Sequence, residues 1–225
     1  MSGITGVILA GGLSTRMGRD KAWLPIGHRT LIELVIQRLR PHVHRLLIVA
    51  NARNACQLER LPVDAVLTDL KPDCGPLMGI YTGLMKTETP LNLFVPCDMP
   101  WIARRLIEQL LSSCCGAVEV VASLHPVEGI QPLPLVCHVN ACRGIGTLLD
   151  QGARSLQSLM SWRRARLVRI EAPELWRSFT NVNTVADYAK CLPLRGRHST
   201  ARDHADSTMA DGETPAWGGV KRVEP

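Results

Sequence analysis

The sequence predicts an α/β fold of three layers, in which helices cover both faces of one mostly parallel sheet. Two observations lead to this prediction. Short apolar, β-branched runs alternate with helix-like stretches along most of the 225 residues, as is typical of parallel sheets. Glycine-rich and acidic segments directly follow several of these runs, at the position where open α/β sheets bind ligands.

The expected strands are short and rich in Val, Ile and Leu, residues that favour a buried, extended conformation. They are Ile4–Leu9, Arg45–Ala50, Ala65–Thr68, Leu91–Val95, Val118–Ser123, Leu133–His138 and Arg166–Ile170.

The expected helices show apolar residues at helical spacing. The first is the best marked, because Thr30 and Glu33 form a capping-box pattern before it and Pro41 ends it. The helices are Leu31–Arg40, Leu77–Lys86, Ala103–Ser112, Ala141–Asp150, Ser155–Ser161 and Val185–Cys191.

The composition changes after Pro193. Residues 195–225 are rich in Gly, Ser, Thr, Asp and His and contain few large apolar side chains. Such a segment cannot bury enough surface to offset the entropy lost on ordering. The sequence therefore predicts one domain over residues 1–194 and a disordered polar tail over residues 195–225.

The composition also limits the class of protein. A net charge of +6 suits a polyanionic ligand such as a nucleoside triphosphate, although an ordinary basic surface would give the same charge. Aromatic residues make up only 4%, which argues against a base-stacking surface, and no nucleic-acid-binding signature is present. No apolar run reaches the roughly 18 residues of a membrane span, and no export signal precedes the first strand. We therefore expect a soluble, cytoplasmic protein with neither a nucleic-acid nor a membrane partner.

The eight cysteines lie mostly within apolar stretches, and none form a Cys-x-x-Cys pair. Free, mostly buried thiols are therefore expected rather than disulfides or structural zinc. The histidines and cysteines also do not form a recognisable catalytic set, which argues against covalent nucleophilic catalysis.

The segment after the first expected strand has the features of a phosphate-binding loop. Gly11, Gly12 and Gly18 allow close approach of backbone N–H groups to phosphate oxygens, and Arg16 and Lys21 supply positive charge. The segment matches neither the Walker A pattern nor Gly-x-Gly-x-x-Gly. A tight turn is the simpler interpretation of the glycines alone, but the two cations in the same loop favour phosphate binding.

Asp98 follows another expected strand and lies between two prolines. It could cap the helix near Ala103 or stabilise a turn. It could also bind Mg²⁺, which takes one or two carboxylates together with substrate phosphates and water. The nearby phosphate loop favours the metal.

Four further polar residues are candidates on weaker grounds. Asn51 and Asp69 each follow an expected strand and could be turn residues or ligand contacts. Asn181 and Asn183 would project on one face at strand spacing, where two amides suit a polar heterocycle or a phosphate. Thr184, just after them, could be an ordinary helix N-cap.

Taken together, these segments resemble the molybdenum cofactor guanylyltransferase family, from about Ile4 to Leu192. The opening loop is shared by many nucleotidylyltransferases, whereas Asn-Val-Asn-Thr points to the guanylyl branch. The usual Asn-Ala-Asn-Arg is Asn51-Ala-Arg-Asn54 in this chain. The matching segments are Leu9-Ala-Gly-Gly, Arg16-Met-Gly, Asp20-Lys21, Asp69, Gly75-Pro-Leu-x-Gly79, Pro96-Cys-Asp98-Met-Pro100 and Asn181-Val-Asn-Thr184.

The resemblance implies a Rossmann-like nucleotidyltransferase fold and a reaction in which GTP and Mo-molybdopterin give molybdopterin guanine dinucleotide and pyrophosphate. It places Mg²⁺ on Asp98 and the pterin beside Asn181 and Asn183. It also implies contacts with molybdoenzyme apoproteins and cofactor-maturation proteins. The residues that it implies bind GTP are Leu9, Ala10, Gly11, Gly12, Lys21, Asn51, Asp69 and Asp98.

The chemistry of the transfer assigns the catalytic roles. A terminal phosphate of the acceptor attacks the α-phosphorus in line and pyrophosphate leaves, which requires alignment and charge neutralisation more than acid–base catalysis. Arg16 and Lys21 would stabilise the charge on the β- and γ-phosphates, and Asp98 would hold the metal.

Three other functions remain open at this point. A molybdopterin cytidylyltransferase or a sugar-phosphate nucleotidylyltransferase would use the same opening loop. A non-catalytic nucleotide-sensing subunit could keep the fold, but it need not retain Arg16, Lys21 and Asp98.

Overall fold

The computed structural model describes residues 3–12, 20–72, 74–162 and 164–191. These residues belong to one compact unit. The expected tail at 195–225 lies outside the described residues, so the two-part organisation stays a prediction. No helix in the described ranges is long and apolar enough to cross a membrane.

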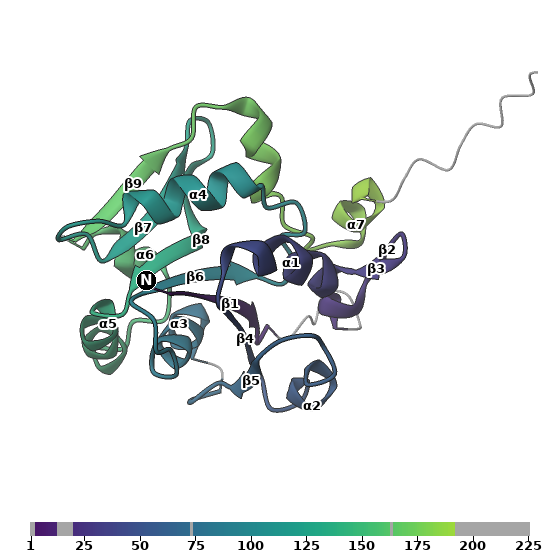
Figure 1. The fold of residues 1–225 in the computed structure, drawn as a ribbon, viewed down its shortest axis with the longest axis horizontal. Coiled ribbons are helices and arrows are strands. Elements are labelled where there is room, and N and C mark those ends of the chain that lie inside the picture. Colours follow the sequence, from purple (N-terminus) through teal and green to yellow (C-terminus); the bar gives the residue numbers. More distant parts are fainter. Residues whose placement is uncertain (1–2, 13–19, 73, 163, 192–225) are drawn as a thin grey trace, which may run out of the picture. The chain divides into compact units, whose positions relative to one another are not determined.

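A seven-stranded sheet forms the centre of the unit, in the order β5-β4-β1-β6-β8-β7-β9 (Figure 1). The first four of these strands are mutually parallel, β8 is antiparallel to both β6 and β7, and β9 is parallel to β7. This confirms the predicted α/β fold with a mostly parallel sheet. The strands are β1 (Ile4–Ala10), β4 (Arg45–Ala50), β5 (Ala65–Thr68), β6 (Leu91–Pro96), β7 (Val120–His125), β8 (Gly129–His138) and β9 (Ala165–Arg169).

Helices cover both faces of this sheet, with α1 and α4 on one side and α3 and α5 on the other (Figure 1). Side chains alternate along each strand, so neighbouring residues enter different cores. Ile8 packs with the first pair of helices and Val7 with the second. The helices are α1 (Leu31–Leu39), α2 (Ala55–Leu58), α3 (Pro76–Leu84), α4 (Arg104–Ser113), α5 (Ala141–Asp150), α6 (Gln157–Met160) and α7 (Val185–Cys191).

The start of α1 has the predicted cap. The Glu33 carboxylate accepts hydrogen bonds from the backbone N–H of Thr30 at 2.7 Å and from its hydroxyl at 2.8 Å. Helix α3 lies close to β6 because residue 83 is glycine. A Cβ at Gly83 would come within 2.7 Å of the Phe94 ring, so this close packing requires the absence of a side chain.

The structure differs from the predicted elements at the start of β8 and in several short elements. Strand β8 begins at Gly129 rather than at Leu133, because the residues between them pair with β7. A local apolar run does not reveal such pairing. The predicted elements also did not include α2, the hairpin of β2 (Pro25–Ile26) and β3 (Arg29–Thr30), or the 3-10 helices η2 (Lys21–Trp23), η3 (Arg40–His42) and η4 (Pro173–Phe179).

Candidate active site

A cavity of about 650 Å³ lies at the carboxyl ends of the parallel strands. Loops that are far apart in the sequence reach it because parallel strands end at the same edge of the sheet. In the register of the sheet, for example, Leu9 on β1 lies beside Pro96 on β6. The residues lining the cavity are Leu9, Gly11, Gly12, Asp20, Lys21, Val49, Asp69, Gly75, Pro76, Gly79, Pro96, Cys97, Asp98 and Leu133.

The start of the predicted phosphate loop opens onto this cavity. Gly11 lies close to Asp69: a Cβ built at Gly11 would be 3.3 Å from the Asp69 Oδ2 atom. Gly12 also lines the cavity and is exposed, and a Cβ at this position would meet no atom of the described residues within 4 Å. Ala10 is buried in the core beneath them. Arg16 lies outside the described residues.

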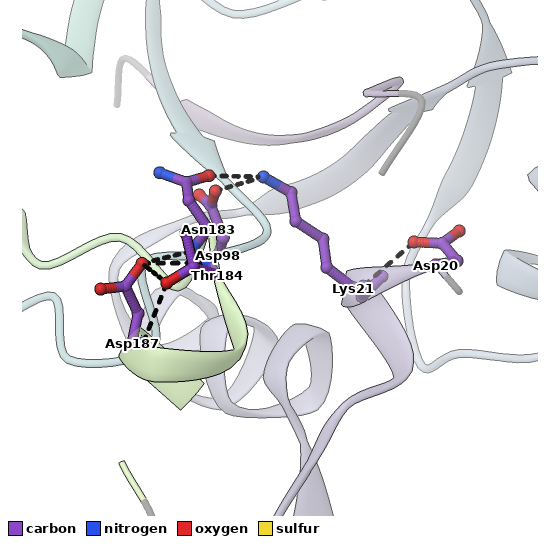
Figure 2. Close-up of polar contacts among 7 residues, drawn as sticks. Asp20, Lys21, Asp98, Asn183, Thr184 and Asp187 are labelled. Atoms are coloured by element: carbon purple, nitrogen blue, oxygen red, sulfur yellow. Dashed lines mark hydrogen bonds and ion pairs between the residues drawn. The ribbon is translucent and has the colours of Figure 1, made fainter. Parts of the chain in front are cut away.

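Lys21 and Asp98 line the cavity, and Asn183 joins them through Lys21 (Figure 2). The Lys21 Nζ atom forms an ion pair with Asp98 Oδ2 and donates a hydrogen bond to Asn183 Oδ1 at 3.2 Å. Lys21 is carried by η2, and Asp98 follows β6. Asp98 lies 77 positions and Asn183 lies 162 positions after Lys21 in the sequence, so only the fold brings the three residues together.

The loop that carries Asn183 is fixed against the Asp98 loop. The backbone N–H of the buried Val182 donates to the Asp98 carbonyl oxygen at 3.0 Å. Asn181 and Asn183 flank Val182 and are exposed. Thr184 also acts at the start of α7, because its Oγ1 accepts the backbone N–H of Asp187 at 3.1 Å. The cap and the Lys21 contact are therefore compatible.

The Asp98 carboxylate has the features of a metal ligand. Asp98 is only 4% exposed, and its Oδ1 atom is buried without a hydrogen-bond partner among the described residues. A buried oxygen of this kind costs free energy unless something binds it. Asp98 does not cap α4, since Ala103 is the N-cap residue and no side chain in the described ranges caps the helix; the Ala103 N–H donates to Ser178 Oγ at 3.0 Å. An oxygen at the cavity that lacks a hydrogen-bond partner in the described part of the chain suits a divalent cation.

The described residues contain no group of three or more His, Cys, Asp and Glu side chains that could hold a metal by themselves. A cation at Asp98 would take its other ligands from phosphate oxygens and water, which suits Mg²⁺-type coordination.

Asp69 is a half-buried carboxylate on the cavity wall. Its Oδ1 atom accepts a hydrogen bond from Thr82 Oγ1 at 3.0 Å. Burial raises the pKa of Asp69 above its usual value, and the Thr82 hydrogen bond only partly offsets this. Ionised Asp69 is thus less favourable in the folded than in the unfolded chain.

We expect Asp69→Asn to raise the melting temperature at neutral pH. A carboxyl whose pKa is raised by folding makes the protein less stable as the pH rises through that pKa, and the amide variant lacks this cost. Asp64→Asn is the matched control, because the Arg40 hydrogen bond lowers the pKa of Asp64 and its loss should destabilise the chain. Thermal melts at about pH 7 and about pH 4 measure both effects. A lower melting temperature than that of the wild-type chain in both variants at neutral pH would contradict the prediction.

Asn51 and Asn54 lie beside the phosphate loop rather than on the cavity wall formed by the described residues. The Asn51 side chain donates to the Gly11 carbonyl at 3.3 Å. The Asn54 side chain donates to the carbonyl of Ala10 and to the carboxylate of Asp20, each at 2.9 Å. Neither Asn54 nor Asp20 was among the predicted site residues, although Asp20 lines the cavity. Their spacing in the sequence contains no signal that they are in contact.

Cys97 lies beside Asp98 but is not a suitable nucleophile. Its thiol is buried, and burial raises its pKa to about 12, so little thiolate forms at neutral pH. All eight cysteines are free, as predicted, but only Cys97, Cys114 and Cys137 are buried. The expectation that most would be buried was wrong, because Cys56 and Cys115 lie on exposed helical and loop positions.

Comparison with known proteins identifies the family. The model of the MobA-like NTP transferase domain matches residues 6–167. The molybdenum cofactor guanylyltransferase of Serratia proteamaculans is 35% identical over 196 residues, which cover 86% of this chain and 96% of the relative.

Two solved structures share the fold. One is molybdopterin-guanine dinucleotide biosynthesis protein A from Archaeoglobus fulgidus, with a TM-score of 0.67, 20% identity, and coverage of 83% of this chain and 96% of that one. The other is a Mycobacterium tuberculosis protein in complex with manganese, with a TM-score of 0.63, 19% identity, and coverage of 84% and 98%. At these identities the structures support the fold alone, whereas the sequence matches support the family. The chain therefore belongs to the MobA-like NTP transferases, in the family of the molybdenum cofactor guanylyltransferases.

Proposed function

We propose that this chain transfers GMP from GTP to Mo-molybdopterin, forming molybdopterin guanine dinucleotide and releasing pyrophosphate. The observation that carries the proposal is the meeting of Lys21, Asp98 and Asn183 at a cavity on the carboxyl edge of the sheet. A guanylyltransferase relative at 35% identity supports the choice of GTP.

In this proposal the nucleotide binds along the glycine segment and the carboxyl ends of the strands. Backbone N–H groups of Gly11 and Gly12 and the ammonium of Lys21 compensate the charge of the triphosphate, with Arg16 as a further cation. Asp98 and Asn183 hold the Lys21 ammonium at the cavity, so little reorganisation is needed when charge develops in the transition state. Leu9, Ala10, Asn51 and Asp69 complete the proposed GTP site.

The proposed cofactor is a divalent cation, with Mg²⁺ as the specific choice. Asp98 would hold it through the buried Oδ1 atom, and when bound it supplies charge neutralisation at the phosphate oxygens. The manganese complex of the related M. tuberculosis structure is consistent with a divalent metal in this fold.

The pterin substrate is expected beside Asn181 and Asn183. Both amides flank the same buried residue and face away from the core, and Asn183 contacts Lys21. This would place the acceptor phosphate near the Lys21 ammonium, which in this proposal compensates the charge of the nucleotide. Interaction with molybdoenzyme apoproteins and cofactor-maturation proteins remains a prediction from the family, and a cytoplasmic location remains a prediction from the composition.

A thermal-shift panel of GTP, CTP, ATP and UTP with Mg²⁺ tests the proposal. At a ligand concentration of 100 times Kd, binding stabilises a protein by about 2.7 kcal/mol, or roughly 5–10 °C at this chain length. We expect the largest shift with GTP. A larger shift with CTP would favour the cytidylyltransferase alternative. GTP binding without pyrophosphate release in the presence of loaded molybdopterin would favour the nucleotide-sensing subunit.

A further inference from the structure

We propose that Asn54 is a positioning residue for transfer, which holds Lys21 in place through the carboxylate of Asp20. The inference rests on the proposed function for its kinetic consequence. Asn54 is 6% exposed and does not line the cavity formed by the described residues. It acts through its neighbours rather than by touching the nucleotide.

The Asn54 amide connects the two described ends of the glycine segment. Its Nδ2 atom donates to the carbonyl of Ala10, at the end of β1, and to Asp20 Oδ2, just before η2, each at 2.9 Å. Both partners can only accept a hydrogen bond when the carboxyl is ionised. A flipped amide would therefore place three oxygens together, so only one orientation satisfies the contacts.

Asn51 holds Asn54 in this position. Asn51 Oδ1 accepts the backbone N–H of Asn54 at 3.1 Å, while its Nδ2 donates to the Gly11 carbonyl at 3.3 Å. The two asparagines thus bind the consecutive carbonyls of Ala10 and Gly11. Because these carbonyls are engaged from one side, the backbone at the start of the phosphate loop has a defined orientation.

Asp20 transmits this restraint to Lys21. Its Oδ1 atom accepts the backbone N–H of Ala22 at 3.0 Å, and its carbonyl accepts that of Trp23 at 3.2 Å. These contacts cap η2, the single turn that begins at Lys21. Without the Asn54 amide, Asp20 Oδ2 loses its hydrogen-bond donor, and the turn that aims Lys21 at Asp98 is less restrained.

The chain offers a matched control in Asn92. This side chain is also buried, and its Nδ2 donates to two backbone carbonyls, those of Thr89 at 3.3 Å and Cys137 at 3.5 Å. In both asparagines the Oδ1 atom is buried without a partner among the described residues. Asn92 lies near the start of β6, at the opposite edge of the sheet from the cavity. Asn54→Ala and Asn92→Ala therefore remove similar buried amides at different places.

We expect Asn54→Ala to lower kcat at saturating GTP by about 10- to 100-fold, because small misplacements of a charge-stabilising group cost this much. Asn92→Ala should lower the melting temperature similarly but keep the wild-type kcat per folded molecule. Equal kcat in the two variants would overturn the proposal.

A rescue variant separates positioning from general destabilisation. Asn54→Asp places a second carboxylate against Asp20 and should be at least as impaired as Asn54→Ala. Adding Asp20→Asn restores one donor–acceptor pair, and its Oδ1 can still accept the Ala22 N–H. We expect the double variant to recover part of the lost kcat; no recovery would contradict the proposed restraint.

Hydrogen exchange of the Ala22 amide, measured by NMR without nucleotide, tests the restraint apart from the reaction. It should accelerate in Asn54→Ala and not in Asn92→Ala. If exchange accelerates in this way but the wild-type chain does not bind GTP, the proposed function is refuted and the restraint is supported. Unchanged exchange in Asn54→Ala would refute the restraint itself.

Discussion

Replacing Lys21 by alanine is expected to reduce turnover at saturating GTP by about 10²- to 10³-fold, the usual cost of removing one donor to developing charge. The Lys21 ammonium lies at the cavity and forms an ion pair with Asp98. It is held by two side chains before any nucleotide arrives, so its contribution is preorganised. Pyrophosphate release with GTP and molybdopterin at saturation measures the effect.

Loss of Lys21 also leaves the Asp98 carboxylate without its ion-pair partner. A buried charge without a partner is destabilising, so turnover must be expressed per folded molecule. Arg164→Ala is the control, because Arg164 forms an ion pair with the buried Glu119. Glu119 adjoins the start of β7 and its carbonyl accepts the His138 N–H, far from the carboxyl ends of the parallel strands. Near-normal turnover of Lys21→Ala would contradict the role given to this residue.

The second large effect is expected for Asp98→Asn. The substitution keeps the shape and an acceptor for Lys21 but removes the negative charge that a divalent cation requires. We expect turnover to fall by about 10²-fold or more at ordinary metal concentrations. The metal concentration needed for half-maximal activity should rise. Titration with Mg²⁺ and, separately, with Mn²⁺ gives both numbers.

Glu119→Gln is the matched control for Asp98→Asn. It neutralises another buried carboxylate that is paired with a cation, but it does so away from the cavity. This variant should keep the wild-type metal dependence even if it is less stable. If both variants show the same metal dependence as the wild-type chain, Asp98 is not the metal ligand.

Local patterns were sufficient to predict most regular elements. The strand at Ala65–Thr68 and the helices at Ala141–Asp150 and Val185–Cys191 have the predicted bounds. Their apolar periodicity and turn residues act over a few positions, and a sequence displays such signals directly. The extension of β8 to Gly129 was missed because it depends on pairing with β7. Pairing across strands adds hydrogen bonds that local composition does not record.

The sequence by itself determined the α/β class and the loops that carry the phosphate-binding and metal-binding candidates. It could do so because glycine, proline and carboxylate residues have local conformational and chemical preferences. Only the tertiary structure decided that Lys21 meets Asp98 and Asn183, that Ser178 rather than Asp98 accepts the Ala103 N–H before α4, and that Asn54 joins Ala10 to Asp20. These contacts depend on strand order and on the direction of individual side chains. Both are properties of the assembled sheet, in which residues distant in the chain reach the same edge.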